Sequence, residues 1–168
     1  MVRRLHETIG DGPPPALEPL AERFAPLVSS NDPEMAESRE IAEDLLANQS
    51  EYVVLHGDIH HGNVLHFGSN WKVIDPKAVF GARAFDYANI FANPLPTPLD
   101  PQRFARRLVM ISALSGLSKV ELCQWVIAWT SLSSIWSVED GHKAAAQSAL
   151  ALKDIAQIRL REMHGNQA

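Results

Sequence analysis

The sequence contains little of what marks several other classes of protein. It has one cysteine, Cys123, so no disulfide can form within the chain, and a reducing, cytoplasmic location is expected. No stretch reaches the roughly 20 consecutive apolar residues that a membrane-spanning helix needs, so we expect no membrane association. The 15 Lys and Arg residues are outnumbered by 20 Asp and Glu residues. This balance disfavours a nucleic-acid-binding protein, which needs clustered cations against phosphates.

What the 168 residues do contain is the pattern of one mostly helical domain, over residues 1–168. A chain of this length buries about 70% of its unfolded surface, which is enough for a core. Apolar residues at three- and four-residue steps, together with capping residues, predict the helices. We expect helices at 1–9, over 17–28, from Asp32, through 85–91, from Asp100 to Gly116, from Ser118 to Glu139, and over about 142–163. In the last one, the residues expected to face inward are Ala145, Ala149, Leu152, Ile155 and Ile158.

The β-structure is predicted only between residues 52 and 75. A short apolar strand leads into a polar loop, a second strand leaves it, the turn Gly68-Ser69-Asn70 reverses the chain, and a third strand ends on Asp75. From Asp75 to Gly81 we expect an irregular loop. The fold class is therefore α+β and mostly helical, with a small β-hairpin.

Three polar residues of this segment have the spacing of a phosphoryl-transfer site. Kinases use a catalytic-loop Asp that accepts the hydroxyl proton, an Asn five residues later and a further Asp, the last two holding magnesium. Asp58, Asn63 and Asp75 match that order. Asn63 and Asp75 are equally distant in sequence from Ser69, which predicts that they oppose each other across the hairpin, with Cβ atoms roughly 4.5–5.5 Å apart. Their side-chain oxygens would then be placed to share one Mg²⁺ ion.

Four segments of the sequence resemble a known family. They are Leu55-His56-Gly57-Asp58-Ile59-His60-His61-Gly62-Asn63, Ile74-Asp75-Pro76-Lys77, Phe85-Asp86-Tyr87-Ala88-Asn89 with Asn93-Pro94, and Trp136-Ser137-Val138-Glu139-Asp140-Gly141. In them the chain is similar to the aminoglycoside phosphotransferase-like kinases, most closely the streptomycin 6-kinase and hydroxyurea kinase group. One departure is Ala78, where that group is expected to have Gly, so we expect the local backbone after Asp75 to differ from that of the group.

The resemblance implies both a fold and an activity. The fold is the C-terminal lobe of a protein kinase-like structure, and the activity is antibiotic-resistance phosphotransfer from ATP, with Mg²⁺, to an alcohol group of a small molecule such as streptomycin. Asp58 would be the catalytic base, and Asn63 and Asp75 the metal ligands. His56 would support the catalytic loop, and Asp86 would be the buried acid that accepts hydrogen bonds from that loop's backbone.

Five further residues are candidates for contacts with substrate or phosphate. The resemblance implies that His60 or His61 would line the acceptor pocket. Lys77 would contact phosphate or would simply be exposed. Glu139 and Asp140 would face a cationic substrate, or would only end a helix in a surface loop.

Other chemistries fit these residues less well. The histidines His56, His60 and His61 suggest zinc, but adjacent residues of an extended segment point in opposite directions, and no second ligand group has metal-binding spacing. Gly57-Asp58-Ile59-His60 is similar to the Asp-x-His element of metallophosphoesterases, a two-metal hydrolase class whose further ligand motifs are missing here. A non-catalytic remnant of a kinase fold is the third alternative.

One part that a kinase site requires is not recognised in the sequence. A kinase-like site needs a β-rich N-terminal lobe that covers the phosphates and supplies a strand lysine. Before His56 the sequence predicts only two helices and a proline run. We therefore expect the chain to be the second lobe alone, able to fold but inefficient as a kinase without the first lobe.

Overall fold

The computed structural model describes residues 2–7, 17–93 and 100–165. Residues 94–99, which follow the helix predicted through 85–91 and include Pro94 of the Asn93-Pro94 pair, lie outside the described residues, as do residues 8 and 9 of the first predicted helix. In chain order the elements are α1 (Val2–Leu5), β1 (Glu18–Pro19), α2 (Leu20–Arg23), α3 (Ala25–Val28), the 3-10 helix η1 (Pro33–Met35), α4 (Ala36–Ala47), β2 (Tyr52–Leu55), the 3-10 helix η2 (His61–Asn63), β3 (Val64–Phe67), β4 (Asn70–Val73), β5 (Val79–Ala82), α5 (Ala84–Phe91), α6 (Pro101–Ser115), α7 (Lys119–Glu139) and α8 (Lys143–Gly165).

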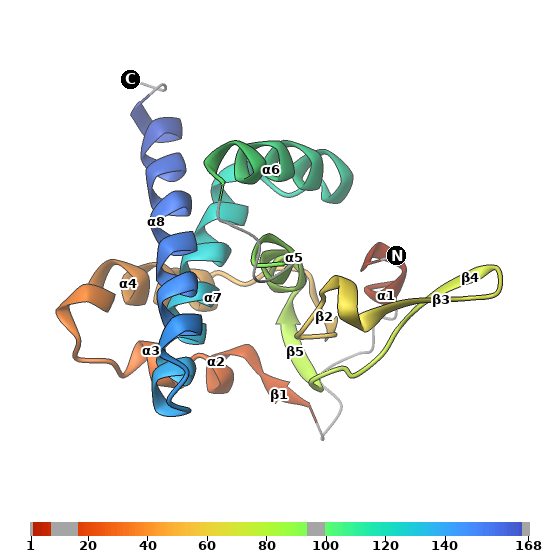
Figure 1. Ribbon diagram of the computed structural model, residues 1–168, viewed down its shortest axis with the longest axis horizontal. Helices are drawn as coiled ribbons and strands as arrows, with labels where there is room; N and C mark the ends of the chain where they lie inside the picture. Colours follow the sequence, from red (N-terminus) through yellow and green to blue (C-terminus); the bar gives the residue numbers. More distant parts are fainter. Residues whose placement is uncertain (1, 8–16, 94–99, 166–168) are drawn as a thin grey trace.

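The long helices α7 and α8 form an antiparallel pair, whereas α1 lies apart from them on the side of the β3–β4 hairpin (Figure 1). Helix α7 packs on α5, α4, α3 and α6 as well as on α8. Trp125 of α7 is fully buried, and its ring meets those of Phe24 and Phe85 edge-on, with centroids 5.9 Å away in each case. The apolar side of α7 is therefore the centre of the core, and the mostly helical α+β class is confirmed.

The helix ends follow the local signals in the sequence. The side chains of Asp32, Asp100 and Ser118 each accept a hydrogen bond from a backbone N–H of the first turn. Gly116 ends α6 with φ of +78°, the left-handed conformation that glycine adopts without strain. These predictions are confirmed because capping depends only on residues close in sequence.

The prediction of one helix over residues 17–28 is wrong. Residues 18 and 19 form the short strand β1, and the helical part is split into α2 and α3 at Phe24. Pro26 explains the break, because it has no N–H to continue the hydrogen-bond ladder of α2. The apolar spacing was still informative, since Leu20, Phe24 and Leu27 are all buried.

The predicted irregular loop up to Gly81 is also wrong, because residues 79–82 form strand β5. This strand lies at the centre of a three-stranded sheet of order β1-β5-β2, parallel to β1 and antiparallel to β2. Gly81 allows the close packing, since a Cβ there would lie 2.5 Å from Leu20 Cδ1. The sheet places the end of β2, where the polar loop begins, beside the start of β5.

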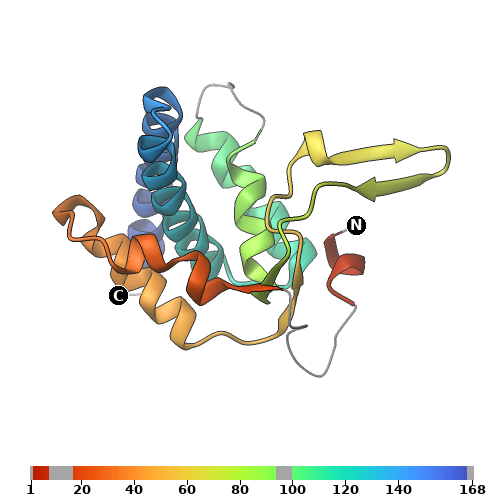
Figure 2. The same cartoon turned by 90° about the horizontal axis from the view of Figure 1, so that it is seen from below.

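Strands β3 and β4 form the predicted hairpin, which projects from the body of the molecule in both views (Figures 1 and 2). Its register differs by one residue from the prediction. Phe67 pairs with Asn70, so the turn contains Gly68 and Ser69 alone. Continued one step past Val64 and Val73, this register sets Asn63 opposite Ile74, and the Ile74 N–H donates to the Asn63 carbonyl at 3.0 Å. Asn63 is therefore not directly opposite Asp75.

The inward face of α8 is also displaced from the predicted one. Ala145 and Ile158 are exposed, and Ala149 and Ile155 are half-buried. Leu152 is buried as expected, and Ala146, Ala156 and Leu160 join it. The helix packs along α7, and this contact selects the buried stripe. Within the described ranges, no helix is both long and apolar enough to cross a membrane.

Candidate active site

The site is built around the loop that leaves β2, at His56, Gly57 and Asp58. Gly57 has φ of +78°, and this left-handed residue turns the chain so that Asp58 leaves the sheet. A Cβ at Gly57 would lie 3.0 Å from Val79 Cγ2 and 3.1 Å from Lys77 Cβ. The backbone of the loop therefore passes so close to β5 and the preceding residues that any added Cβ would crowd Val79 and Lys77.

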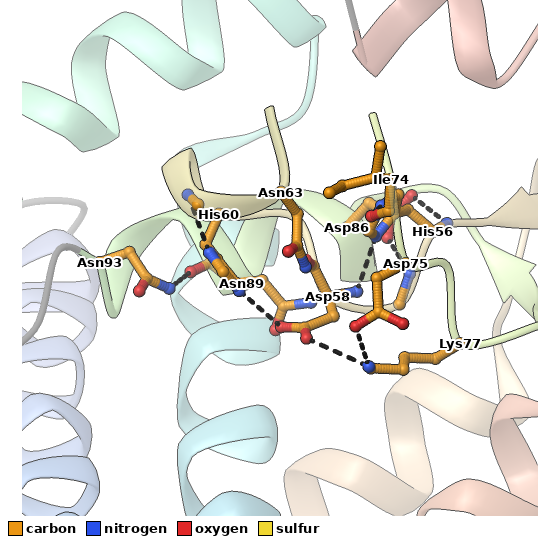
Figure 3. Close-up of polar contacts among 12 residues, drawn as sticks. His56, Asp58, His60, Asn63, Ile74, Asp75, Lys77, Asp86, Asn89 and Asn93 are labelled. Atoms are coloured by element: carbon orange, nitrogen blue, oxygen red, sulfur yellow. Dashed lines mark hydrogen bonds and ion pairs between the residues drawn. The ribbon is translucent and has the colours of Figure 1, made fainter. Parts of the chain in front are cut away.

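The loop is fixed by Asp86 of α5, which is completely buried. Its Oδ2 accepts a hydrogen bond from the His56 N–H at 3.0 Å, and its Oδ1 accepts one from the Gly57 N–H at 2.8 Å (Figure 3). Hydrogen bonds to an ionised carboxylate are among the stronger ones in proteins. One side chain of the helical core, Asp86, thus holds both residues that precede Asp58, namely His56 and Gly57.

The ring of His56 connects the loop to the end of the hairpin. The Asp58 N–H donates to His56 Nδ1 at 3.2 Å, and His56 Nε2 lies 2.9 Å from the Ile74 carbonyl oxygen. A carbonyl only accepts and an N–H only donates, so both contacts require the neutral tautomer with its proton on Nε2. A further bond joins the Lys77 N–H to the His56 carbonyl at 2.7 Å. These contacts hold Asp58 and the Ile74 to Lys77 segment together.

Asn63, at the end of η2, is buried and oriented by the same loop. Its Nδ2 donates to the Asp58 carbonyl at 3.1 Å, and this contact leaves Oδ1 as the ligand atom of the amide. In Figure 3 the side chains of Asn63, Asp58 and Asp75 approach one region from three segments of the chain. Although the hairpin register is shifted, the three candidate side chains are thus brought to the same side of the loop.

Asp75 reaches this region through an unusual backbone conformation and is paired with Lys77. It has φ of +59°, and Ala78 has φ of +52°, the conformation that would favour the glycine expected there. Lys77 Nζ lies 2.7 Å from Asp75 Oδ2 and 3.7 Å from Asp58 Oδ2. The hydrogen bond from Lys77, and its charge, lower the pKa of Asp75, while the same bond raises the pKa of Lys77. Asp75 is therefore an anion at neutral pH.

The oxygen donors of the site fit magnesium better than zinc. Mg²⁺ is typically held by one or two carboxylates together with substrate phosphates and water, rather than by a complete protein cage. Asp75 and Asn63 supply a carboxylate and an amide oxygen, and the ammonium of Lys77 already lies between two acids where positive charge is favoured. Among the described residues there is no group of three or more His, Cys, Asp or Glu side chains placed to hold a metal ion.

Comparison with known proteins defines the family of this chain. The family described as "Aminoglycoside/hydroxyurea antibiotic resistance kinase" matches residues 1–141, which include every residue of the site. The chain belongs to this kinase family.

Individual relatives are similar over shorter parts of their length. The chain is 42% identical over 158 residues to the streptomycin 3''-kinase of Klebsiella pneumoniae, covering 89% of this chain and 59% of that protein. It is 27% identical over 103 residues to the hydroxyurea phosphotransferase of Kitasatospora aureofaciens, covering 61% and 29%, and 28% identical over 104 residues to the streptomycin 6-kinase of Streptomyces glaucescens, covering 59% and 34%. The chain thus spans less than two thirds of the length of these relatives. No solved structure matches it.

Of the predicted substrate contacts, only some lie beside Asp58. His60 Nε2 is 3.8 Å from Asp58 Oδ1, while its Nδ1 accepts from the Gly62 N–H at 3.1 Å. His61 is exposed, and its ring meets that of His60 with centroids 6.1 Å apart. Glu139 and Asp140 are exposed at the C-terminal end of α7. Their role in acceptor binding stays a prediction.

Two buried residues near the site were missed by the sequence analysis. His6, which follows α1, contacts Asp86 although the two are 80 residues apart in sequence. Asn89 of α5 is 2% exposed, and within the described part of the chain neither side-chain atom of its amide has a hydrogen-bond partner. Figure 3 shows Asn89 between Asn93 and Asp58. Asn89 follows Asp86 by three residues, so both lie on one face of the helix, and this spacing could have indicated that Asn89 is near the site. No pattern in the sequence indicates the position of His6.

Proposed function

We propose that this chain forms the catalytic and acceptor-binding part of an ATP-dependent phosphotransferase that acts on an alcohol group of a small molecule, with an aminoglycoside such as streptomycin as the acceptor. The observation that carries the proposal is the approach of Asp58, Asn63 and Asp75 to one region, on a loop fixed by Asp86, in a member of this kinase family. The names of the streptomycin kinases among the relatives support the choice of acceptor.

Asp58 is the proposed catalytic base. Its side chain is about one third exposed at the tip of a fixed loop, so a bound alcohol can reach the carboxylate. Its position is set by the bonds to the preceding two residues and by the contact of its own N–H with His56. Such fixation matters because phosphoryl transfer depends mainly on positioning and electrostatic stabilisation.

Asn63 and Asp75 are the proposed magnesium ligands, through Asn63 Oδ1 and the Asp75 carboxylate. When bound, the ion would neutralise phosphate charge and hold the nucleotide. The lowered pKa of Asp75 keeps it in the anionic form that a metal ligand requires. Lys77 lies 2.7 Å from Asp75 and is proposed to contact a phosphate oxygen, since its flexible ammonium is placed at the edge of the same region.

The proposed reaction is a direct displacement at the γ-phosphorus. The alcohol oxygen forms a bond to phosphorus, the bond from phosphorus to the β–γ bridging oxygen breaks, and ADP leaves. The hydroxyl proton passes to the Asp58 carboxylate. His60, within 3.8 Å of Asp58, is proposed to line the acceptor side. Asn89 of α5 offers a buried amide that has no hydrogen-bond partner among the described residues.

The experiment measures ATP-dependent and Mg²⁺-dependent transfer of labelled phosphate to streptomycin. Because the chain spans 59% of the Klebsiella streptomycin 3''-kinase, two proteins are compared: the 168-residue chain, and the chain joined to the part of that kinase which the alignment leaves uncovered. The proposal is supported if the joined protein transfers phosphate and if Asp75→Ala reduces this transfer by raising the KM for Mg-ATP. Hydrolysis of phosphate esters without ATP would favour a hydrolase instead, and no reaction in either protein would favour a non-catalytic role.

A further inference from the structure

The contact between His6 and Asp86 joins the N-terminal segment to the anchor of the Asp58 loop. His6 Nε2 lies 2.8 Å from Asp86 Oδ2, and the side chain of His6 is 5% exposed while that of Asp86 is 0% exposed. The ring of His6 also meets that of Tyr87 edge-on, with centroids 5.9 Å apart. Both groups are thus withdrawn from water, and the contact is direct.

The chemistry of the contact fixes which atom donates. An ionised carboxylate only accepts hydrogen bonds, so the proton is on His6 Nε2. Asp86 then accepts three bonds, one from His6 and two from the backbone N–H groups of His56 and Gly57. A buried carboxylate is stable only when its oxygens are supplied with donors. Removing the His6 donor therefore leaves Oδ2 with the His56 N–H as its remaining partner among the described residues.

The effect of Asp86 extends to both acids of the site. Asp86 holds the backbone of His56, and the ring of His56 holds the Asp58 N–H and the Ile74 carbonyl, next to Asp75. A change in the position of the Asp86 carboxylate is therefore transmitted to the loop through two consecutive hydrogen bonds. Networks of this kind behave as a unit, so losing one member weakens the others.

We infer that His6 is a positioning residue for Asp58. Its Nε2–H holds the Asp86 carboxylate in the orientation that fixes the His56–Gly57 backbone and, through it, the catalytic carboxylate. That Asp58 is catalytic rests on the proposed function, but the positioning of its loop by His6 does not depend on that function. The competing explanation is that His6 only packs α1 against Tyr87, in which case the ring matters and the hydrogen bond does not.

Two variants separate the hydrogen bond from the packing. His6→Phe keeps a flat ring against Tyr87 and removes the donor, whereas His6→Gln keeps an amide N–H donor and removes the ring. His164→Phe, on the exposed last turn of α8, is the matched control. We expect His6→Phe to speed amide hydrogen exchange at His56 and Gly57 about tenfold, with His6→Gln within about threefold of the wild type.

Activity in the joined protein supplies a second readout. His6→Phe should lower kcat about tenfold with the KM for ATP unchanged, and His6→Gln should restore most of it, because only the position of the base is altered. Unchanged exchange at both amides in His6→Phe would overturn the inference, as would a His6→Gln variant that is as impaired as His6→Phe. If the wild type transfers no phosphate but exchange still responds, the proposed function fails and the positioning of the loop stands.

A spectrum of the wild type guards against a variant that does not fold. Nitrogen-15 NMR of the histidine side chains should show His6 with its proton on Nε2, slowly exchanging with solvent. A His6 ring with the proton on Nδ1, or with fast exchange at Nε2, would contradict the hydrogen bond to Asp86 and with it the inference.

Discussion

Replacing Gly57 by alanine tests how tightly the catalytic loop is held. Gly57 lies between His56 and Asp58 with φ of +78°, and a Cβ there would be 3.0 Å from Val79 Cγ2. Val79 is completely buried in β5 and is paired with Leu55, so it has little freedom to move. The substitution therefore adds one methyl group to a space that the surrounding strands have already filled.

The expected loss of stability has two parts. Placing a non-glycine residue in the left-handed region costs roughly 1–2 kcal/mol. Forcing a methyl group into a packed site typically costs a further 1–3 kcal/mol. Gly116→Ala is the matched control, because Gly116 has the same φ of +78° but nothing within 4 Å of the added Cβ. We expect about 2–5 kcal/mol for Gly57→Ala and only the backbone part, about 1–2 kcal/mol, for Gly116→Ala.

The assay is urea denaturation followed by the fluorescence of the four tryptophans. In the joined protein, Gly57→Ala should also reduce phosphate transfer by about a hundredfold, because a shift of about 1 Å in a catalytic group has an effect of that size. Gly116→Ala should leave transfer unchanged. Equal destabilisation by the two substitutions would refute the close contact between the loop and β5.

Other predictions concern the core and its thiol. Trp125→Ala should lower the free energy of unfolding by about 3–5 kcal/mol, since it leaves a cavity between Phe24 and Phe85; a loss below about 1 kcal/mol in urea denaturation would contradict this packing. Burial raises the pKa of Cys123 to about 12 from 9.0, so the thiol should react with a disulfide reagent at pH 8 only after unfolding. Because the pKa of this thiol is higher in the folded state than in the unfolded state, its ionisation does not affect the free energy of unfolding below pH 9.0. Between pH 9.0 and about 12 the free energy of unfolding should fall by about 1.4 kcal/mol per pH unit, because only the unfolded chain loses the thiol proton. Cys123→Ala should lose less stability over that range, and an equal loss would contradict the raised pKa.

The parts of the fold predicted from the sequence are those decided by near neighbours in the chain. Asp100, Ser118 and Gly116 end or begin helices through contacts within four residues, and the apolar stripe of α7 repeats along one helix. Strand β5 was missed because it is four residues long, contains Gly81, and is defined by pairing with β2, which ends 24 residues earlier in the chain. Its sequence carries no strand pattern of its own.

The candidate site shows the same division. The spacing of Asp58, Asn63 and Asp75 follows from the order of strand, loop and hairpin, so their gathering was predictable. The hairpin register was not, because a turn of two residues instead of three shifts every pair by one. Asp75 still faces the site because its φ of +59° redirects the chain after β4. The contact of His6 with Asp86 joins residues 80 apart, and no local pattern indicates it.

The substitution Asp58→Asn tests whether Asp58 is the base of a phosphotransferase. The substitution keeps the size of the side chain and removes its capacity to accept a proton, while Asp154→Asn, an exposed acid on α8, controls for the loss of one negative charge. In the joined protein, with streptomycin and Mg-ATP, we predict that Asp58→Asn lowers kcat by about a hundredfold or more and leaves the KM for ATP nearly unchanged. A variant that retains turnover close to that of Asp154→Asn would contradict the account.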